Sequence, residues 1–540
     1  FSPDSEKIAV AQSDNIVYIY KIGKEWNERK SICNKFPMPS PVTCMVWPRD
    51  RANEIVFGLA EGKVRAGVLK VNKSNVLYQT DVYVVSIACS RDGETIISGH
   101  IDGTIYSYQL NSQISKKVCT HHSVPYALAY GENIMAAGND QLVTFYDLSG
   151  NFLQRFDYTK DDKVRDFTVA AFNPSGDTVV LGNFNRFYVY NFNSKRGQWE
   201  EIVCKNIKNY YTVTSVCWKN DGSKLLTGNL CGSLDMYEAS MKKIRYKGKF
   251  EFNYVSPSQV VVLTLATGKK SVVRSGNSQE ITKINIYQDR YVVANTYETV
   301  IVGDLETDKT SEVMWRGAGN EKYDFSSPNL CMIFNAGELT LIEYGNNEPL
   351  GTCRTELMKP NLLSARLSEK GAKVIAYLLD LQTIAINDLQ NSTTICQISH
   401  DSKVDFMELN AHANKLLFKD KRKQLYLYNL ATLTKTTLLP YCSYAKWVPE
   451  SEVVVAQNRN NLNVWYSIDN PDKVTIYAIK GDVEDIERKG GKTDVIVTEG
   501  GNNIAYSLDE PLIEFGFAIE ARDLEKAATI LDGSEMTNET

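Results

Sequence analysis

Short apolar runs separated by polar turns fill the chain from its first residues onward. The opening stretch, FSPDSEKIAVAQSDNIVYIY, holds two such runs, at residues 8–11 and 16–20. The runs follow a period of two, which predicts β-strands that turn one face towards a core. Gly, Asn and Asp interrupt them every five or six residues, as is typical of tight turns. The opening of the chain therefore predicts a β-hairpin.

The same pattern recurs at a nearly constant interval. Six repeats align on the residue before their first turn, which is Phe1, Trp47, Cys89, Tyr130, Phe172 and Trp218. These positions are 41 to 46 residues apart. The pattern then weakens, but third strands are still predicted near Ser271, Val300, Leu339, Ile384, Leu425, Leu462 and Ile504. The sequence therefore predicts thirteen repeats of roughly 30–48 residues each.

Repeats of about this length with three or four short strands are typical of β-propeller blades. Helical repeats would place apolar residues at i, i+3, i+4 and i+7, which these runs do not. One small sheet cannot bury its faces alone, so we expect the blades to close into rings, each with about four to eight blades. We predict an all-β fold of two tandem seven-bladed WD40-type β-propellers. Because thirteen repeats are one short of two such rings, the first propeller is expected to lack its N-terminal blade, which would lie upstream of Phe1.

The domain boundaries follow from changes in this pattern. The regular turns stop after Glu238, and the stretch MKKIRYKGKFEF follows at 241–252. We therefore predict a first propeller over residues 1–245 and a second over 246–510. In the tail, four apolar residues fall on one helical face, with Gly533 as a stop: Leu524, Ala527, Ala528 and Leu531. Residues 511–540 are accordingly predicted to begin an α-helical, TPR-like repeat solenoid.

Composition restricts the classes of partner and compartment. The chain has 540 residues, 43% hydrophobic and 23% charged, which is ordinary for a soluble globular protein. Its net charge of -5 gives no reason to expect nucleic acid as a partner, and it has no apolar run long enough to span a membrane. None of the eleven cysteines forms a C-x-x-C pair, and Cys44, Cys89, Cys217 and Cys331 lie in apolar runs. We interpret them as core thiols of a protein in a reducing compartment such as the cytoplasm.

Two short motifs raise the question of enzymatic or metal chemistry. In KGGKTD (489–494), Gly491-Lys492-Thr493 matches the end of a phosphate-binding loop, but Ile486 occupies the place of the required first glycine. The stretch also lies between two predicted strands, which favours a hairpin turn. CTHH (119–122) offers a thiol and two imidazoles, but adjacent strand residues point to opposite faces, which favours a surface or inter-strand loop. We therefore expect no enzyme, catalytic residue, metal or cofactor.

A basic run is the one candidate contact site. Four cations alternate with Ile244, Tyr246, Gly248 and Phe250, and they are Lys243, Arg245, Lys247 and Lys249. On a single strand they would share one face. At about 1 kcal/mol per basic residue near an anionic membrane, that face would contribute on the order of 4 kcal/mol. The alternative is a solvated outer strand of an ordinary blade.

Several segments, in the expected order, point to one protein family. They are FSPDSEKIAVAQSDNIVYIYKIG, VFGLAEGKVR, SGHIDGTIY, CMIFNAGELTLIEYGNN, WVPESEVVVAQNRNNLNVWYSID and LDEPLIEFG. Together they resemble the N-terminal half of the intraflagellar transport protein 172 family. The Trp-Asp dipeptide of WD repeats is missing, and Tyr146-Asp147 and Tyr237-Glu238 stand nearest to it.

The resemblance implies a non-enzymatic scaffold, a peripheral subunit of intraflagellar transport complex B that is needed for cilium assembly. Its partners would be other complex B subunits and, indirectly, ciliary motors and microtubules. It would reside in the cilium or flagellum, including the basal body and ciliary tip, and in the cytoplasm. The alternative, since vesicle-coat subunits share the double-propeller architecture, is a coat-like membrane-associated trafficking subunit that uses the basic run on anionic lipid.

Overall fold

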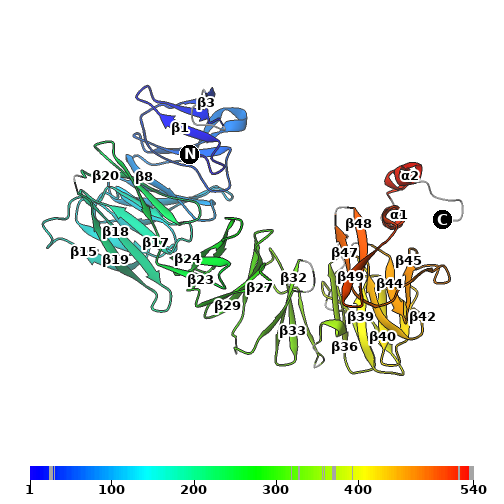
Figure 1. Ribbon diagram of the computed structural model, residues 1–540. Coiled ribbons are helices and arrows are strands. Elements are labelled where there is room, and N and C mark those ends of the chain that lie inside the picture. The colour runs from blue at the N-terminus through cyan, green and yellow to red at the C-terminus, as the bar shows by residue number, and fades with distance from the viewer. Residues whose placement is uncertain are drawn as a thin grey trace. The chain divides into compact units, whose positions relative to one another are not determined.

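The computed structural model consists almost entirely of β-strands, with two α-helices at the C-terminal end (Figure 1). It describes all residues except 24–27, 29–30, 209, 318, 326, 328, 356, 358, 368–372, 392, 450, 490, 521–522 and 534–540. The strands of the described residues form thirteen sheets, each built from strands that follow one another in the chain. We number these sheets 1 to 13 in chain order.

The first seven sheets cover the N-terminal half. Sheet 1 contains β1 (Lys7–Ala11), β2 (Ile16–Lys21) and β3 (Ser31–Pro37), and sheet 2 contains β4 (Val42–Val46), β5 (Glu54–Leu59), β6 (Lys63–Val68) and β7 (Lys73–Gln79). Sheet 3 contains β8 (Val84–Cys89), β9 (Thr95–His100), β10 (Thr104–Gln109) and β11 (Ile114–Thr120), and sheet 4 contains β12 (Ala127–Tyr130), β13 (Ile134–Ala137), β14 (Leu142–Tyr146) and β15 (Phe152–Asp157). Sheet 5 contains β16 (Val169–Phe172), β17 (Thr178–Gly182), β18 (Arg186–Asn193) and β19 (Gln198–Asn206), and sheet 6 contains β20 (Val213–Trp218), β21 (Lys224–Asn229) and β22 (Leu234–Glu238). Sheet 7 contains β23 (Lys242–Tyr246), β24 (Phe250–Ser256), β25 (Gln259–Thr264) and β26 (Lys270–Arg274).

Six sheets follow in the C-terminal half. Sheet 8 contains β27 (Lys283–Tyr287), β28 (Tyr291–Asn295), β29 (Thr299–Asp304) and β30 (Lys309–Met314), and sheet 9 contains β31 (Lys322–Asp324), β32 (Leu330–Asn335), β33 (Glu338–Glu343) and β34 (Gly351–Arg354). Sheet 10 contains β35 (Leu363–Leu367), β36 (Lys373–Leu378), β37 (Thr383–Asp388) and β38 (Thr393–Ser399), and sheet 11 contains β39 (Val404–Leu409), β40 (Lys415–Asp420), β41 (Leu425–Asn429) and β42 (Thr434–Leu439). Sheet 12 contains β43 (Cys442–Trp447), β44 (Val454–Asn458), β45 (Asn461–Trp465) and β46 (Thr475–Ala478), and sheet 13 contains β47 (Asp482–Lys489), β48 (Lys492–Glu499) and β49 (Asn502–Ser507). Short 3₁₀ helices lie at Leu69–Val71 and Pro360–Leu362, and the α-helices are α1 (Glu510–Glu520) and α2 (Leu524–Gly533).

Burial changes from the inner to the outer strands of a sheet. In sheet 5, all five residues of β17 (TVVLG) are buried, whereas most of β19 (QWEEIVCKN) is exposed. A strand that is covered on both faces needs apolar side chains at successive positions, and an outer strand does not. This difference explains why the middle strands read as continuous apolar runs in the sequence, and why the outer ones are polar.

The hydrophobic cores lie between consecutive sheets. Between sheets 1 and 2, Val17 and Ile19 of β2 pack with Phe57 of β5. Between sheets 4 and 5, Phe145 of β14 stacks on Trp199 of β19, with ring centroids 4.6 Å apart. Each such side chain stabilises the fold by about 1.5–3 kcal/mol when it is fully buried. Sheets that share such a core depend on each other, as expected for repeats that cannot bury their faces alone.

The structure confirms most of the repeat pattern read from the sequence. The thirteen predicted repeats correspond to thirteen sheets. Six of the seven later positions lie in third strands, but Ser271 lies in β26, the fourth strand of sheet 7. That prediction is wrong because the stretch at 241–252 supplies β23, the first strand of this sheet, so that the third strand is β25.

The chain divides into two compact units. The first comprises Phe1–Ile301 and Leu305–Asp308, and the second comprises Val302–Asp304 and Lys309–Thr540. The predicted boundary near residue 245 lies within β23. The all-β fold of blade-like sheets is as predicted, while the grouping into two seven-bladed rings remains a prediction.

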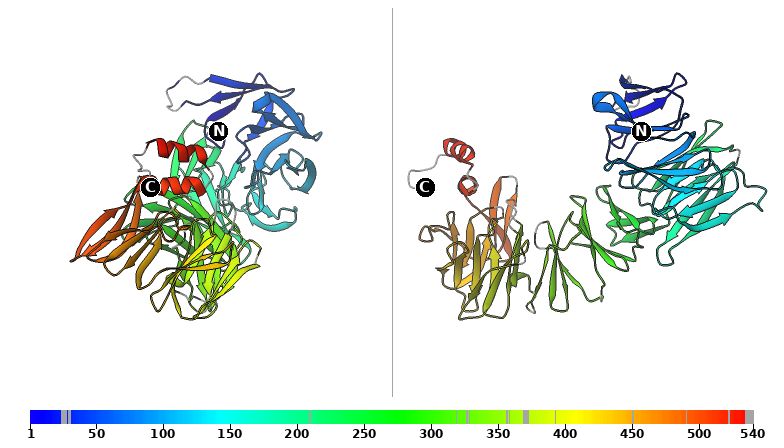
Figure 2. Two further views of the ribbon diagram at one scale, coloured as in Figure 1. Left: turned by 90° about the vertical axis from the view of Figure 1, so that its right-hand side faces the viewer. Right: turned by 180° about the vertical axis from the view of Figure 1, so that it is seen from behind.

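The two helices continue directly from sheet 13, and they lie together in every view (Figures 1 and 2). Ile513 of α1 is buried in a cluster with residues of sheets 12 and 13. In α2, Ala527 is buried, whereas Leu524 and Leu531 are exposed, so the predicted apolar face is only partly covered. Gly533 is the last described residue of α2, and both the predicted stop there and the solenoid remain predictions. No helix among the described residues is long and apolar enough to cross a membrane.

Candidate functional site

The predicted basic contact face lies on the first hairpin of sheet 7. Lys243 and Arg245 are in β23, where they pair with Asn253 and Glu251 of β24. Ile244, between them, packs against the core between sheets 7 and 8. Lys243 and Arg245 therefore share the exposed face of the strand, as the alternation predicted.

The other two cations of the run belong to the turn of this hairpin. β23 ends at Tyr246, and Lys247 and Gly248 follow with positive φ angles of 49° and 66°. Lys249 comes directly before β24. Because the chain reverses here, the alternation of the strand does not extend to Lys247 and Lys249.

Acidic neighbours compensate much of the positive charge. Lys243 forms an ion pair with Glu238, at 3.2 Å, and Lys249 forms one with Asp289. Lys247 donates a hydrogen bond to the carbonyl of Ile286, at 3.3 Å. Exposed pairs of this kind contribute only about 0–1 kcal/mol each, but they lower the net charge that a partner meets. The use of these four residues as a contact face stays a prediction.

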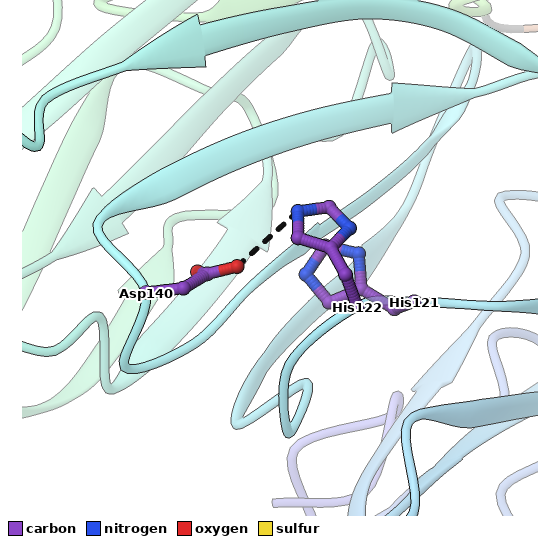
Figure 3. A group of neighbouring side chains, drawn as sticks. All are labelled: His121, His122 and Asp140. Atoms are coloured by element: carbon purple, nitrogen blue, oxygen red, sulfur yellow. Dashed lines mark ion pairs between the residues drawn. The ribbon is translucent and has the colours of Figure 1, made fainter.

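A second group of side chains lies in the connection between sheets 3 and 4. His121 and His122 follow the last residue of β11, Thr120, and Asp140 lies in the turn between β13 and β14. One ligand atom from each of the three residues lies within 4.8 Å of the others (Figure 3). The strand alternation that argued against a metal here does not apply, because the histidines lie beyond the strand. Their ring centroids are 4.3 Å apart.

Two glycines let the backbone of this connection pack closely. The amide of His121 donates to the carbonyl of Gly103, at 2.8 Å. Gly103 has a φ of +85°, and a Cβ there would lie 2.2 Å from the carbonyl oxygen of His121. A Cβ on Gly138 would lie 2.1 Å from the carbonyl oxygen of Val124. Any larger residue at either position would move the connection and the histidines with it.

Polar contacts hold the side chains of the group. His122 Nε2 lies 3.2 Å from Asp140 Oδ2, and the amide of Leu142 donates to Asp140 Oδ1, also at 3.2 Å. His121 Nδ1 is 2.8 Å from the hydroxyl of Tyr146. Figure 3 shows both imidazoles on the same side of the connection, with Asp140 facing His122.

Burial lowers the pKa of both imidazoles. Burial and the neighbouring His122 lower the pKa of His121 to about 4, and together they outweigh the opposing effect of Asp140. The pKa of His122 is also lowered, mainly by burial, with Asp140 opposing and Arg155 assisting. Neutral imidazoles carry a free nitrogen lone pair, which is the form that binds metals.

Sequence reasoning missed Asp140 and Tyr146 as members of this group. Asp140 stands in the polar turn of IMAAGNDQLVTFY, and nothing in that turn shows that it meets His122. Cys119, which the sequence placed beside the histidines, lies within β11 and outside the group, and burial raises its pKa to about 11.

The stretch that resembles a phosphate-binding loop is a hairpin, as predicted. Lys489 of β47 pairs with Lys492 of β48, and Gly491 lies in the turn with a φ of +75°. Thr493 is fully buried, and its hydroxyl donates to Glu510 of α1, at 2.5 Å. This hydroxyl, which would bind Mg²⁺ in a nucleotide site, holds a helix in place instead.

Comparison with known proteins gives the family. The family described as WD domain, G-beta repeat matches residues 73–109, which cover β7 to β10. The chain is 51% identical over 556 residues to intraflagellar transport protein 172 of Chlamydomonas reinhardtii, covering 100% of the chain and 32% of the relative. It is 49% identical over 553 residues to the human homolog, again covering 100% of the chain and 32% of the relative. The resemblance to the intraflagellar transport protein 172 family is confirmed.

The similarity extends to a distant relative. Intraflagellar transport protein osm-1 of Caenorhabditis elegans is 39% identical over 542 residues, covering 99% of the chain and 31% of the relative. The chain thus spans about a third of the length of these relatives of the intraflagellar transport protein 172 family. What the whole protein does and binds is therefore a matter of proposal.

Proposed function

We propose that the chain is part of a non-enzymatic scaffold subunit of intraflagellar transport complex B. It would make protein–protein contacts in the trains that move cargo along ciliary microtubules, and it would be needed for cilium assembly. The observation that carries the proposal is similarity over the whole chain, at 49–51% identity, to proteins named for intraflagellar transport. The cilium or flagellum, with its basal body and tip, and the cytoplasm are the corresponding locations.

The fold supports a role in binding partners. Rigid sheets in series hold many exposed turns in fixed positions, and such turns tolerate sequence change, so they suit specific contacts. Arg422 and Lys423, in the turn between β40 and β41, are an example of exposed charged turn residues. Many modest contacts between neighbouring subunits add through a high effective concentration in a polymeric train. Other complex B subunits are the direct partners in this proposal, and motors and microtubules are indirect ones.

The membrane-associated alternative receives no support from the basic run. Of the four predicted cations, its strand carries Lys243 and Arg245, and Glu238 and Glu251 lie beside them. The attraction of polybasic segments to anionic lipid depends on uncompensated charge near the surface. We therefore keep the scaffold as the one proposed function.

A rescue experiment tests this proposal. Ciliated cells that lack the endogenous protein would receive the full-length protein, or a version in which residues 1–540 are replaced by an unrelated domain of similar size. We expect only the full-length protein to restore cilium number and length and to enter the cilium. Equal rescue by the replaced version would show that this part of the chain is not the scaffold we describe.

A further inference from the structure

We propose that His121, His122 and Asp140 form a binding site for one divalent transition-metal ion, with Zn²⁺ as the ion that the ligand set fits best. The site goes beyond the proposed scaffold function. Two imidazoles and one carboxylate are donors that suit Zn²⁺, Co²⁺ and Ni²⁺, and three protein ligands with one open position are typical of zinc sites that keep a water.

The distances fit this coordination after small side-chain movements. Bonds of about 2.0–2.1 Å in a tetrahedral site place neighbouring ligand atoms about 3.4 Å apart. His122 Nε2 and Asp140 Oδ2 are 3.2 Å apart, and the ligand atoms of all three residues lie within 4.8 Å of one another. The widest of these separations exceeds the tetrahedral spacing by at most about 1.4 Å, so small side-chain movements would complete the set.

An unpaired buried nitrogen points to a ligand. The side chain of His121 is only 2% exposed, and its Nε2 has no hydrogen-bond partner among the described residues. The hydroxyl of Ser123, two residues on, is also buried without a partner there. Buried polar atoms nearly always have a hydrogen-bond partner in native proteins, so two such atoms without a partner in the same connection require an explanation. A metal ion on Nε2, with its water near Ser123, would supply the missing partners.

The outer contacts match those of known metal sites. A metal-bound histidine usually donates its second ring N–H to an oxygen atom, which fixes the tautomer and the ring orientation. The hydroxyl of Tyr146 lies 2.8 Å from His121 Nδ1 and can accept that proton. Asp140 is likewise fixed through its other oxygen by the amide of Leu142.

The electrostatic surroundings allow a cation. Asp140 supplies a negative charge, and Arg155 is the positive group that opposes it. Arg155 lies over the ring of Phe152, 5.4 Å from its centroid. The side chains of His122 and Asp140 are 33% and 22% exposed, which leaves a path for the ion.

The site is tested by measuring metal binding to the chain after a chelator has removed any bound metal. We would titrate it with Co²⁺, following visible absorption, and with Zn²⁺, following calorimetry and the melting temperature. The variants are His121→Ala, Asp140→Asn and Tyr146→Phe. His412→Gln is the matched control, because His412 is also a half-buried histidine beside a carboxylate, Glu452, but belongs to no group of three possible metal ligands among the described residues.

We expect one Zn²⁺ per chain, a rise in melting temperature, and the intense absorption of four-coordinate Co²⁺. His121→Ala and Asp140→Asn should abolish this binding while circular dichroism stays unchanged. Tyr146→Phe should weaken it by about 10- to 100-fold, as outer-contact variants do. His412→Gln should bind as the parent does. Absence of stoichiometric binding to the parent chain, or equal binding by the His121 and Asp140 variants, would overturn the site and leave these contacts purely structural.

Discussion

Ser258 donates two hydrogen bonds to the carboxylate of Asp177, one from its hydroxyl at 2.6 Å and one from its amide at 3.2 Å. Both residues are fully buried. Asp177 stands just before β17 in sheet 5, and Ser258 stands just before β25 in sheet 7. The pair thus joins two sheets that are not consecutive in the chain. The guanidinium of Arg274 adds to this junction by donating to the carbonyl of Pro174, at 2.8 Å.

The Asp177 carboxylate is central to this junction, and its removal should be costly. Its second oxygen accepts from Asn173 at 3.0 Å and from Ser175 at 2.5 Å. Asp177→Ala leaves these buried donors unpaired, so we expect the free energy of unfolding to fall by about 2–4 kcal/mol. Urea unfolding measures this, with the exposed Asp162→Ala as control. A loss below 1 kcal/mol would show that water replaces the carboxylate.

Glu510 holds α1 against sheet 13. Its carboxylate accepts from Arg488 Nε at 2.9 Å, from Arg488 Nη2 at 2.7 Å, and from Thr493. We predict that Glu510→Ala frees α1 and α2 while the sheets stay folded, because a buried network loses its acceptor. Hydrogen exchange should become at least tenfold faster in residues 510–520 and unchanged in β48. Glu525→Ala, on the exposed side of α2, is the control, and the prediction fails if both variants exchange alike.

The fold should lose stability in mild acid partly through His100. This residue is fully buried, and its pKa lies below the ordinary value because of burial, with the carbonyl of Val82 and the charge of Asp102 opposing. The unfolded chain then binds more protons than the folded one as pH falls through about 6.5, so unfolding is favoured. His100→Asn should flatten the fall in unfolding free energy between pH 7 and pH 5. An unchanged slope would place the pH dependence on other groups.

The basic hairpin gives a prediction about lipid. Because Glu238 and Asp289 compensate Lys243 and Lys249, we expect the chain to bind anionic vesicles only weakly at physiological salt. Lys243→Glu combined with Arg245→Glu should change vesicle co-sedimentation by less than about twofold. Lys421→Glu with Lys423→Glu, in another exposed turn, serves as a matched charge control. Strong binding that salt and the first variant alone abolish would revive the membrane-associated alternative.

The sheets were predictable because their signal is local. Apolar runs of period two, cut by turn residues, set the strands, and their repetition gave the number of sheets. Sheet 7 was harder to predict, because basic and apolar residues alternate on both sides of the Lys247-Gly248 turn and so hide the turn within one run. A glycine between two apolar runs is itself a turn signal, and it predicts the hairpin of β23 and β24.

The histidine group was not predictable, for a physical reason. The rule that neighbours point to opposite faces holds inside a strand, and β11 ends at Thr120, one residue before His121. Strand ends are the least certain feature of a sequence-based assignment. The contact between His122 and Asp140 is moreover tertiary, since it depends on how one connection packs on the turn of the next sheet.

The most direct test of the scaffold is to purify the tagged full-length protein from ciliated cells and to map its contacts by crosslinking mass spectrometry. The account predicts that complex B subunits co-purify at moderate salt, that crosslinks join them to exposed lysines within residues 1–540, and that deleting these residues removes those partners. Recovery of vesicle-coat proteins alone, or of complex B subunits that stay bound after the deletion, would contradict it.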